Sequence, residues 1–279
     1  MFFINFKIGH NIIKCKQTIK NVIGKEYPIV NKKNTYIGFF SLVYLIGFAQ
    51  NNQKQIINDE KLFIGIFNQT RYTKRIGTWL DIHHRTTDNY VNRPLQSMGR
   101  LGLTFYFTDH FRLMAGYCFA YNFPAKGFHA NRIEHRPWQQ LYFKQEYHHI
   151  QTIQLLRLEQ RYNQEVVNDN ATNNFIYTSR IRYAFFVLIP FTKSGIVPKK
   201  LFGVINDEVF LNFGKNIKYN TFDQNRFFCG LGYQISKSSS VHFGYMNIFQ
   251  QLASGNVYSK SDCLRLFVFS NLDFRKEKS

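Results

Sequence analysis

The side chains that could carry chemistry in this sequence are charged residues that recur at every second position within stretches of alternating polarity. Residues two apart point to the same face of a β-strand, so these charges would share one face of a sheet. Ten basic and four acidic residues on one face would attract anions, or would pair as arginine–carboxylate bridges that fill a narrow interior. The proposed members of this charged network are Asp81, Arg85, Arg100, Arg112, Lys144, Glu146, Arg157, Glu159, Arg161, Arg180, Arg182, Glu208, Arg226 and Arg265.

Histidines are further candidates, as metal ligands. His83–His84 and His148–His149 are adjacent pairs, and neighbouring residues of a strand face opposite sides of the sheet. Only one member of each pair could therefore face a common site, and no spacing of ligand residues is typical of a metal centre. A cluster of His83, His148 and Glu146 is the most that the pattern offers, and we expect no metal and no cofactor.

Nucleophilic catalysis has a similarly weak signal. Ser240 and His242 are two residues apart and would share a strand face, but no acid or amide that could orient the histidine accompanies them. Gly230-Leu231-Gly232 is not a nucleotide-binding loop, because no helix pattern follows it. We expect a protein that is not an enzyme and has no catalytic residues; a lipid hydrolase of the lipase or deacylase type is the alternative.

The composition excludes several classes of protein. The chain has 279 residues, a net charge of +19, 30 Phe and 17 Tyr, which is too much apolar surface for a disordered tail. Four Cys are too few for a disulfide scaffold, and no apolar run reaches the ~18–20 residues of a membrane-spanning helix. The high positive charge suggests nucleic-acid binding, but we expect none, because the charge is explained by an export signal and by one strand face.

Residues 1–49 have the character of an export leader. They carry seven lysines and a single acid, Glu26, and an uncharged run from Ile37 to Phe48 has the length of a signal-peptide hydrophobic segment. We predict cleavage between Ala49 and Gln50, and we interpret residues 1–30 as partly a gene-model extension. The predicted divisions are an N-terminal extension plus signal peptide at 1–49, a periplasmic lead-in or poorly patterned strand at 50–61, a barrel at 62–274 and a charged tail at 275–279.

A period of two, rather than 3.6, runs through the rest of the chain. In 99–107 and 111–121 the apolar residues hold the odd positions, and a three-residue loop would pair Phe107 with Phe111. This register places Arg100 and Arg112 together on the opposite face. A two-residue turn at 148–149 would likewise place the polar faces of the stretches 138–148 and 150–162 on the same side of the sheet.

We predict an all-β fold, an antiparallel transmembrane β-barrel of about 10–12 strands. Eleven stretches have the pattern, but a periplasmic N-terminus favours an even number, and of twelve and ten we favour twelve. The link 189–200 contains two prolines and cannot be a central strand. Short connections are predicted near 73–74, 108–110, 148–149 and 237–240, and long loops near 87–95, 123–135, 163–174, 214–223 and 253–260.

We expect lipid to cover the apolar face of this barrel. The face is bulky and aromatic on nearly every strand, which would overfill a small soluble interior, and Tyr and Phe gather near strand ends as membrane girdles do. The charged network would then line the lumen of a porin-like protein of unknown specific role, for which a small-solute or anion channel is the expected activity. Its expected partners are outer-membrane lipid and a small anionic solute. A soluble exported barrel that binds a small ligand is the alternative.

Several stretches resemble an uncharacterised outer-membrane family, domain-of-unknown-function family 2490. The similarity extends from about residue 62 to 274, and its motifs are moderately specific. The resemblance implies a Gram-negative outer-membrane barrel and implies no catalytic residues, and the pieces Glu208–Asn212 and Asp223–Arg226 match the family pattern as lumen or loop structure. The similar stretches are GTWLDIHHRTTDN (77–89), RPWQQLYFKQEY (136–147), LLRLEQRY (155–162), NDEVFLNFGKN (206–216) and FDQNRFFCGLGYQISKSSSVHFGYMN (222–247).

Overall fold

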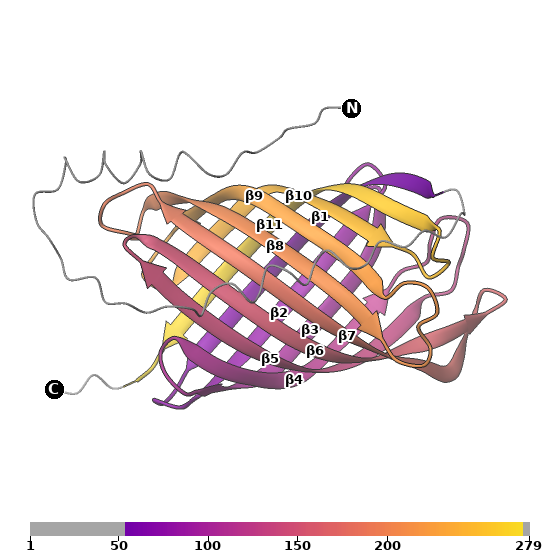
Figure 1. The fold of residues 1–279 in the computed structure, drawn as a ribbon, viewed down its shortest axis with the longest axis horizontal. Coiled ribbons are helices and arrows are strands. Elements are labelled where there is room, and N and C mark those ends of the chain that lie inside the picture. Colours follow the sequence, from indigo (N-terminus) through magenta and orange to yellow (C-terminus); the bar gives the residue numbers. More distant parts are fainter. Residues whose placement is uncertain (1–53, 276–279) are drawn as a thin grey trace, which may run out of the picture. The chain divides into compact units, whose positions relative to one another are not determined.

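The computed structural model describes residues 54–275, which form eleven β-strands closed into a barrel (Figure 1). The leader and cleavage site predicted around residues 1–50, and residues 276–279 of the tail, lie outside the described residues. No helix among the described residues is long and apolar enough to cross a membrane. The strands are β1 (Gln55–Arg71), β2 (Ile76–Thr87), β3 (Arg93–Tyr106), β4 (Phe111–Asn122), β5 (Arg132–Tyr147), β6 (Ile150–Val167), β7 (Asn170–Pro190), β8 (Lys200–Phe213), β9 (Phe222–Gln234), β10 (Ser239–Gln251) and β11 (Val257–Asp273).

Every strand pairs antiparallel with its neighbours in sequence, and the barrel closes through a parallel seam between β1 and β11. The predicted all-β barrel of 10–12 strands is confirmed, but twelve is wrong and the barrel is not wholly antiparallel. Residues 55–61, predicted as a lead-in or separate strand, form the first part of β1 and pair with Val257–Cys263. An odd number of strands makes β1 and β11 run in the same direction, so the closing pair must be parallel.

The strands are strongly tilted relative to the barrel axis. The register followed from Gly65 through β2 and onward reaches Ile176 of β7. Followed the other way, through β11, it reaches Pro190 of the same strand. The offset of fourteen residues over eleven strands corresponds to a tilt of about 40° at ordinary strand spacings.

The burial pattern is that of an inside-out protein. In β3, Leu101 and Leu103 are 61% and 69% exposed on the outer wall, whereas Arg100 and Thr104 are 5% and 2% exposed in the interior. The hairpin register predicted around Phe107 is confirmed, because its amide donates to the carbonyl of Phe111. Alternation of polarity therefore assigns apolar residues to the outside and charged residues to the lumen, strand after strand.

The two ends of the barrel differ less than predicted. We call the end where β1 begins the loop end; it carries the connections 88–92, 123–131, 168–169, 214–221 and 252–256. The opposite, turn end carries 72–75, 107–110, 148–149, 191–199 and 235–238. The long loop predicted at 163–174 is wrong, because β6 and β7 continue outward and meet at Asn168–Asp169. Both residues have positive φ, as two-residue hairpins of this kind require.

Large side chains fill parts of the interior against glycines of nearby strands. Trp138 of β5 is fully buried, and a Cβ on Gly102 of β3 would lie 2.7 Å from its ring. Phe202 of β8 similarly occupies the space beside Gly232 of β9, where a Cβ would lie 2.2 Å from the ring. These contacts, and the apolar clusters around them, leave limited space for the lumen.

Candidate functional site: the arginine-lined lumen

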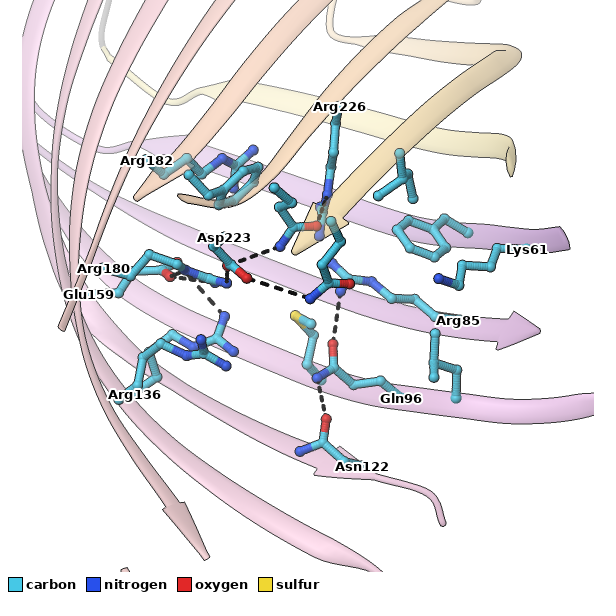
Figure 2. Close-up of a pocket in the computed structure, with 18 of the residues that line it drawn as sticks. Lys61, Arg85, Gln96, Asn122, Arg136, Glu159, Arg180, Arg182, Asp223 and Arg226 are labelled. Atoms are coloured by element: carbon cyan, nitrogen blue, oxygen red, sulfur yellow. Dashed lines mark hydrogen bonds and ion pairs between the residues drawn. The ribbon is translucent and has the colours of Figure 1, made fainter. Parts of the chain in front are cut away.

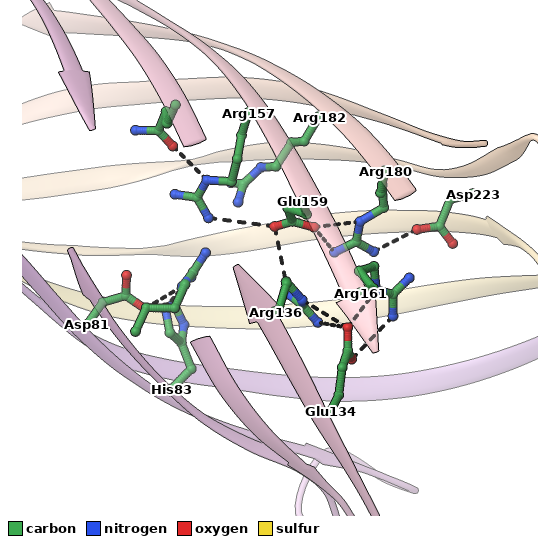
Figure 3. Close-up of polar contacts among 12 residues, drawn as sticks. Asp81, His83, Glu134, Arg136, Arg157, Glu159, Arg161, Arg180, Arg182 and Asp223 are labelled. Atoms are coloured by element: carbon green, nitrogen blue, oxygen red, sulfur yellow. Dashed lines mark hydrogen bonds and ion pairs between the residues drawn. The ribbon is translucent and has the colours of Figure 1, made fainter. Parts of the chain in front are cut away.

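The interior of the barrel holds a chain of ion pairs around two glutamates, Glu134 and Glu159 (Figure 3). Glu134 of β5 accepts from Arg136 at 2.9 Å and from Arg161 of β6 at 2.6 Å. Glu159 of β6 pairs with Arg180 of β7 at 2.6 Å, and Arg180 continues to Asp223 of β9 at 2.8 Å. The network therefore ties β5, β6, β7 and β9 together through charged hydrogen bonds, which are the strong kind.

A second buried group surrounds Asp81 of β2. Its carboxylate accepts from the Arg100 guanidinium at 2.8 Å and lies 2.8 Å from His83 Nε2. The Trp79 indole also donates to it. Asp81 is thus fully engaged by groups on β2 and β3, which suits a structural ion pair better than a reactive acid.

Four interior arginines have no carboxylate partner within 4 Å among the described residues. Their guanidinium carbons instead lie over aromatic rings: Arg85 over Phe63 at 4.5 Å, Arg112 over Tyr142 at 3.5 Å, Arg226 over Phe210 at 4.7 Å and Arg265 over Phe228 at 3.3 Å. Stacking against a ring compensates part of the cost of burying a guanidinium, but it leaves the N–H groups at the edge of each group free to donate. Arg85, Arg226 and Arg265 also line the cavities described below, where such guanidiniums are suited to binding an anion.

Two cavities occupy the remaining space. The first, the loop-end chamber, has a volume of about 220 Å³ and is lined by nine basic and two acidic residues (Figure 2). It extends from amides near the loop end, such as Gln96 and Asn122, inward to the arginines. The lining is strongly positive, so this chamber would concentrate anions.

The second cavity, the turn-end chamber, has a volume of about 100 Å³. It includes residues near the turn end, such as Trp79 and Phe269, and it follows the loop-end chamber along the barrel axis. Five residues line both chambers and form what we call the partition: Phe63, Arg85, Arg100, Arg182 and Arg226. An anion that moves from one chamber to the other must pass four guanidiniums.

Twelve of the fourteen residues predicted for the charged network face the interior in the structure. Lys144 and Glu146 are the exceptions. They lie on the same face of β5 but near the turn end, where they pair with each other at 2.7 Å and are substantially exposed. They lie apart from the buried network because β5 extends beyond the buried part of the lumen before it reaches the turn at 148–149.

The alternating pattern does not select Glu134, Arg136, Lys61 or Asp223, and of these only Asp223 is named, through the family resemblance, as lumen or loop structure. Glu134 and Arg136 continue the even-numbered, inward face of β5, but Glu134 lies within the loop predicted near 123–135, and the predicted strand 138–148 begins after Arg136. Asp223 has the parity of outward residues and turns inward at a β-bulge, since Phe210 pairs with Gln224 and Leu211 pairs with Phe222. Continuing the parity upstream would have found the first two; the bulge has no comparable signal.

The other candidate groups are separated or incompletely built. His83 is buried beside Asp81, whereas Glu146 and His148 lie at the turn end, so the imagined metal cluster is not assembled. No group of three or more His, Cys, Asp or Glu side chains in residues 54–275 is arranged to hold a metal ion. Ser240 Oγ lies 3.3 Å from His242 Nε2, and the aromatic rings of Phe202 and Phe269 pack against that histidine.

Comparison with known proteins gives one match. A family model described as "Protein of unknown function (DUF2490)" matches residues 60–259. The match begins within β1 and ends within β11, so it includes the residues of the loop-end chamber and the partition, whereas Arg265, Phe267 and Phe269 of the turn-end chamber lie beyond it. No curated protein and no solved structure gives a significant match to the chain.

Proposed function

The chain belongs to the DUF2490 family of proteins of unknown function, and from the geometry of its barrel we propose that it is an outer-membrane protein that admits small anions to its lumen and passes them through the partition. The single observation that carries this proposal is the partition itself. Four arginines meet there between two cavities, and two of them, Arg85 and Arg226, have no carboxylate to neutralise them. The leader predicted for residues 1–49 supports export.

The outer wall supports a membrane location. Large apolar side chains such as Ile66, Ile82 and Leu103 are more than half exposed, and water contact over a continuous wall of this kind is strongly unfavourable. A tilt of about 40° lies in the range of outer-membrane barrels. A soluble ligand-binding barrel would carry its charges outside, and here the charges face the lumen.

The proposed orientation places the loop end outside the cell and the turn end in the periplasm, following the usual arrangement of loops and turns. Anions would first enter the loop-end chamber, drawn by its excess of basic residues. The two chambers are small and separated by side chains, so we expect a low unitary conductance rather than that of a wide, water-filled pore. Passage requires the partition arginines to move. Arg85 and Arg226 can move without breaking an ion pair, whereas Arg100 and Arg182 are held by carboxylates.

Single-channel recording tests the proposal. Protein lacking residues 1–49 would be inserted into planar bilayers under a KCl gradient, and its reversal potential measured. We expect small current steps and a reversal potential that corresponds to preference for chloride. A protein that inserts but conducts no ions, or one that prefers potassium, would overturn the proposed passage.

A lipid hydrolase is a less favoured alternative, and the contact that bears on it is between Ser240 and His242. The pair faces the interior, where the acyl chains of membrane lipid would not reach it, and the contacts of His242 are aromatic. We propose that the protein lacks esterase activity. Hydrolysis of a short-chain nitrophenyl ester that disappears in Ser240→Ala would reverse this choice.

A further inference from the structure

The walls of the two chambers differ in chemistry. The loop-end chamber has only two aromatic side chains, Phe63 and Phe210, among its lining residues. The turn-end chamber has Phe63 at the partition and six further aromatic side chains beyond it: Phe67, Trp79, Tyr142, Phe186, Phe267 and Phe269. A hydrated inorganic ion gains nothing from such walls, whereas a flat apolar ring packs well against them.

The arginines of the turn-end chamber also have unused hydrogen-bond donors. Arg157 and Arg265 are each 3% exposed, yet Arg157 Nη1 and Arg265 Nε have no acceptor. The Nε groups of Arg85 and Arg182, at the partition, lack acceptors too. Buried donors without acceptors are rare, because each gives up its hydrogen bond to water without a replacement. A bound group with acceptor oxygens would satisfy them.

The acidic residues nearby do not fill this role. Glu208 is the only carboxylate that lines the turn-end chamber, and it pairs with Arg182 at 2.9 Å. Glu159 lies 3.8 Å from Arg157, which is too far for a hydrogen bond, and is already held by Arg180. The guanidiniums of Arg157 and Arg265 therefore have donor capacity left for a ligand.

The size of the chamber restricts the ligand further. Its volume of about 100 Å³ is somewhat below the ~150 Å³ of an engineered protein cavity that binds benzene. This volume excludes a ligand with more than one ring, and even a single ring with its carboxylate must move side chains of the chamber apart in order to enter.

We infer that the turn-end chamber binds a small aromatic carboxylate, with its ring among the aromatic side chains and its carboxylate on Arg157 and Arg265. This names the class of anion for the passage proposed above and rests on that proposal for its route of access. Planar carboxylates match the fork of a guanidinium with two parallel hydrogen bonds. The reaction is reversible binding alone, and no bond is made or broken.

Intrinsic fluorescence provides the test, because Trp79 lines the chamber and the sequence has only two tryptophans. The barrel, refolded in detergent, would be titrated with benzoate, acetate, benzyl alcohol and sulfate. We expect saturable quenching by benzoate, and affinities lower by about tenfold or more for the other three, because each lacks the ring or the carboxylate. Equal binding of benzyl alcohol would reveal only an apolar pocket, and equal binding of acetate or sulfate only a general anion site; either result would overturn the inference.

Matched glutamine variants locate the site within the barrel. Arg265→Gln removes a donor that lines only the turn-end chamber, and we expect it to weaken benzoate binding by about tenfold. Lys61→Gln changes only the loop-end chamber, and Lys144→Gln changes a basic residue near the turn end that lines neither chamber, so both should bind benzoate normally. Unchanged binding in Arg265→Gln, in protein that migrates as a folded barrel, would contradict the assignment.

The two proposals fail separately. Benzoate binding without ion conductance would overturn the passage and leave the ligand class standing. Chloride-selective conductance without preferential benzoate binding would overturn the ligand class and leave the passage standing.

Discussion

Arg85 of β2 and Arg226 of β9 hold their guanidiniums near the same ring, that of Phe63, at 4.5 and 5.6 Å from its centroid. Neither has a carboxylate partner; Arg85 donates to Gln96 and Arg226 to Gln224, both neutral amides. Two like charges gathered on one ring repel each other, and an anion between them would relieve that repulsion.

This pair gives the first prediction, on ion selectivity. Arg226→Gln, and separately Arg85→Gln, should lower the ratio of chloride to potassium permeability by roughly threefold to tenfold, because each removes an unneutralised charge from the partition. Arg112→Gln is the matched control, since Arg112 lies outside both chambers. Reversal potentials that stay the same in both partition variants would contradict the assigned role.

The second prediction concerns the stability of the ion-pair chain. Glu159 is 1% exposed and lies within 4 Å of Arg136, Arg157 and Arg180. Glu159→Gln leaves these guanidiniums without their shared charge and should lower the free energy of unfolding by about 3–5 kcal/mol. Urea unfolding of the refolded barrel measures the loss. Glu60→Gln, at an exposed outward position, should change it little.

Packing in the lumen gives the third prediction. Gly102→Ala would push a methyl group into the ring of Trp138, and we expect a destabilisation of about 1–3 kcal/mol. Gly99→Ala, in the same strand, meets nothing within 4 Å and should be nearly neutral. Similar unfolding midpoints for the two variants would show that Trp138 is not held against Gly102.

The fourth prediction concerns a contact between loops at the loop end. Asp169 accepts hydrogen bonds from the backbone amides of Ala130 and His129, at 2.9 and 2.8 Å. These bonds hold the pKa of Asp169 below its ordinary value. A lowered folded pKa means that the contact is fully present above the unfolded pKa and is lost as pH falls through the folded one.

Two measurements check this contact. The carboxyl carbon of Asp169 should titrate by NMR at a lower pH than that of an ordinary aspartate. At neutral pH, Asp169→Asn should speed tryptic cleavage after the exposed Lys126, because the amide is a weaker acceptor for the loop. Glu165→Gln, in the same hairpin, is the control, and equal cleavage rates in the two variants would count against the contact.

The sequence predicts the inward and outward faces well because alternation is a local property. It fails where structure depends on distant chain segments. The parallel pairing of β1 with β11 has no local signature, so the strand count was wrong. Pro137, which has no N–H, interrupts the pairing of β5 with β6 between His135 and Trp138. Glu134 and Arg136 lie before or within that interruption, in or beside the predicted loop 123–135, although their parity is that of the inward face. The bulge gives Asp223, which extends the chain of ion pairs to β9, the parity of an outward residue.

The parallel seam also decides where attached groups would be displayed. With eleven strands, β1 begins at the loop end and β11 finishes at the turn end. In the proposed orientation, a peptide tag placed just before Gln55 would be presented to antibodies on intact cells. The same tag placed after residue 275 would become accessible only after the outer membrane is permeabilised.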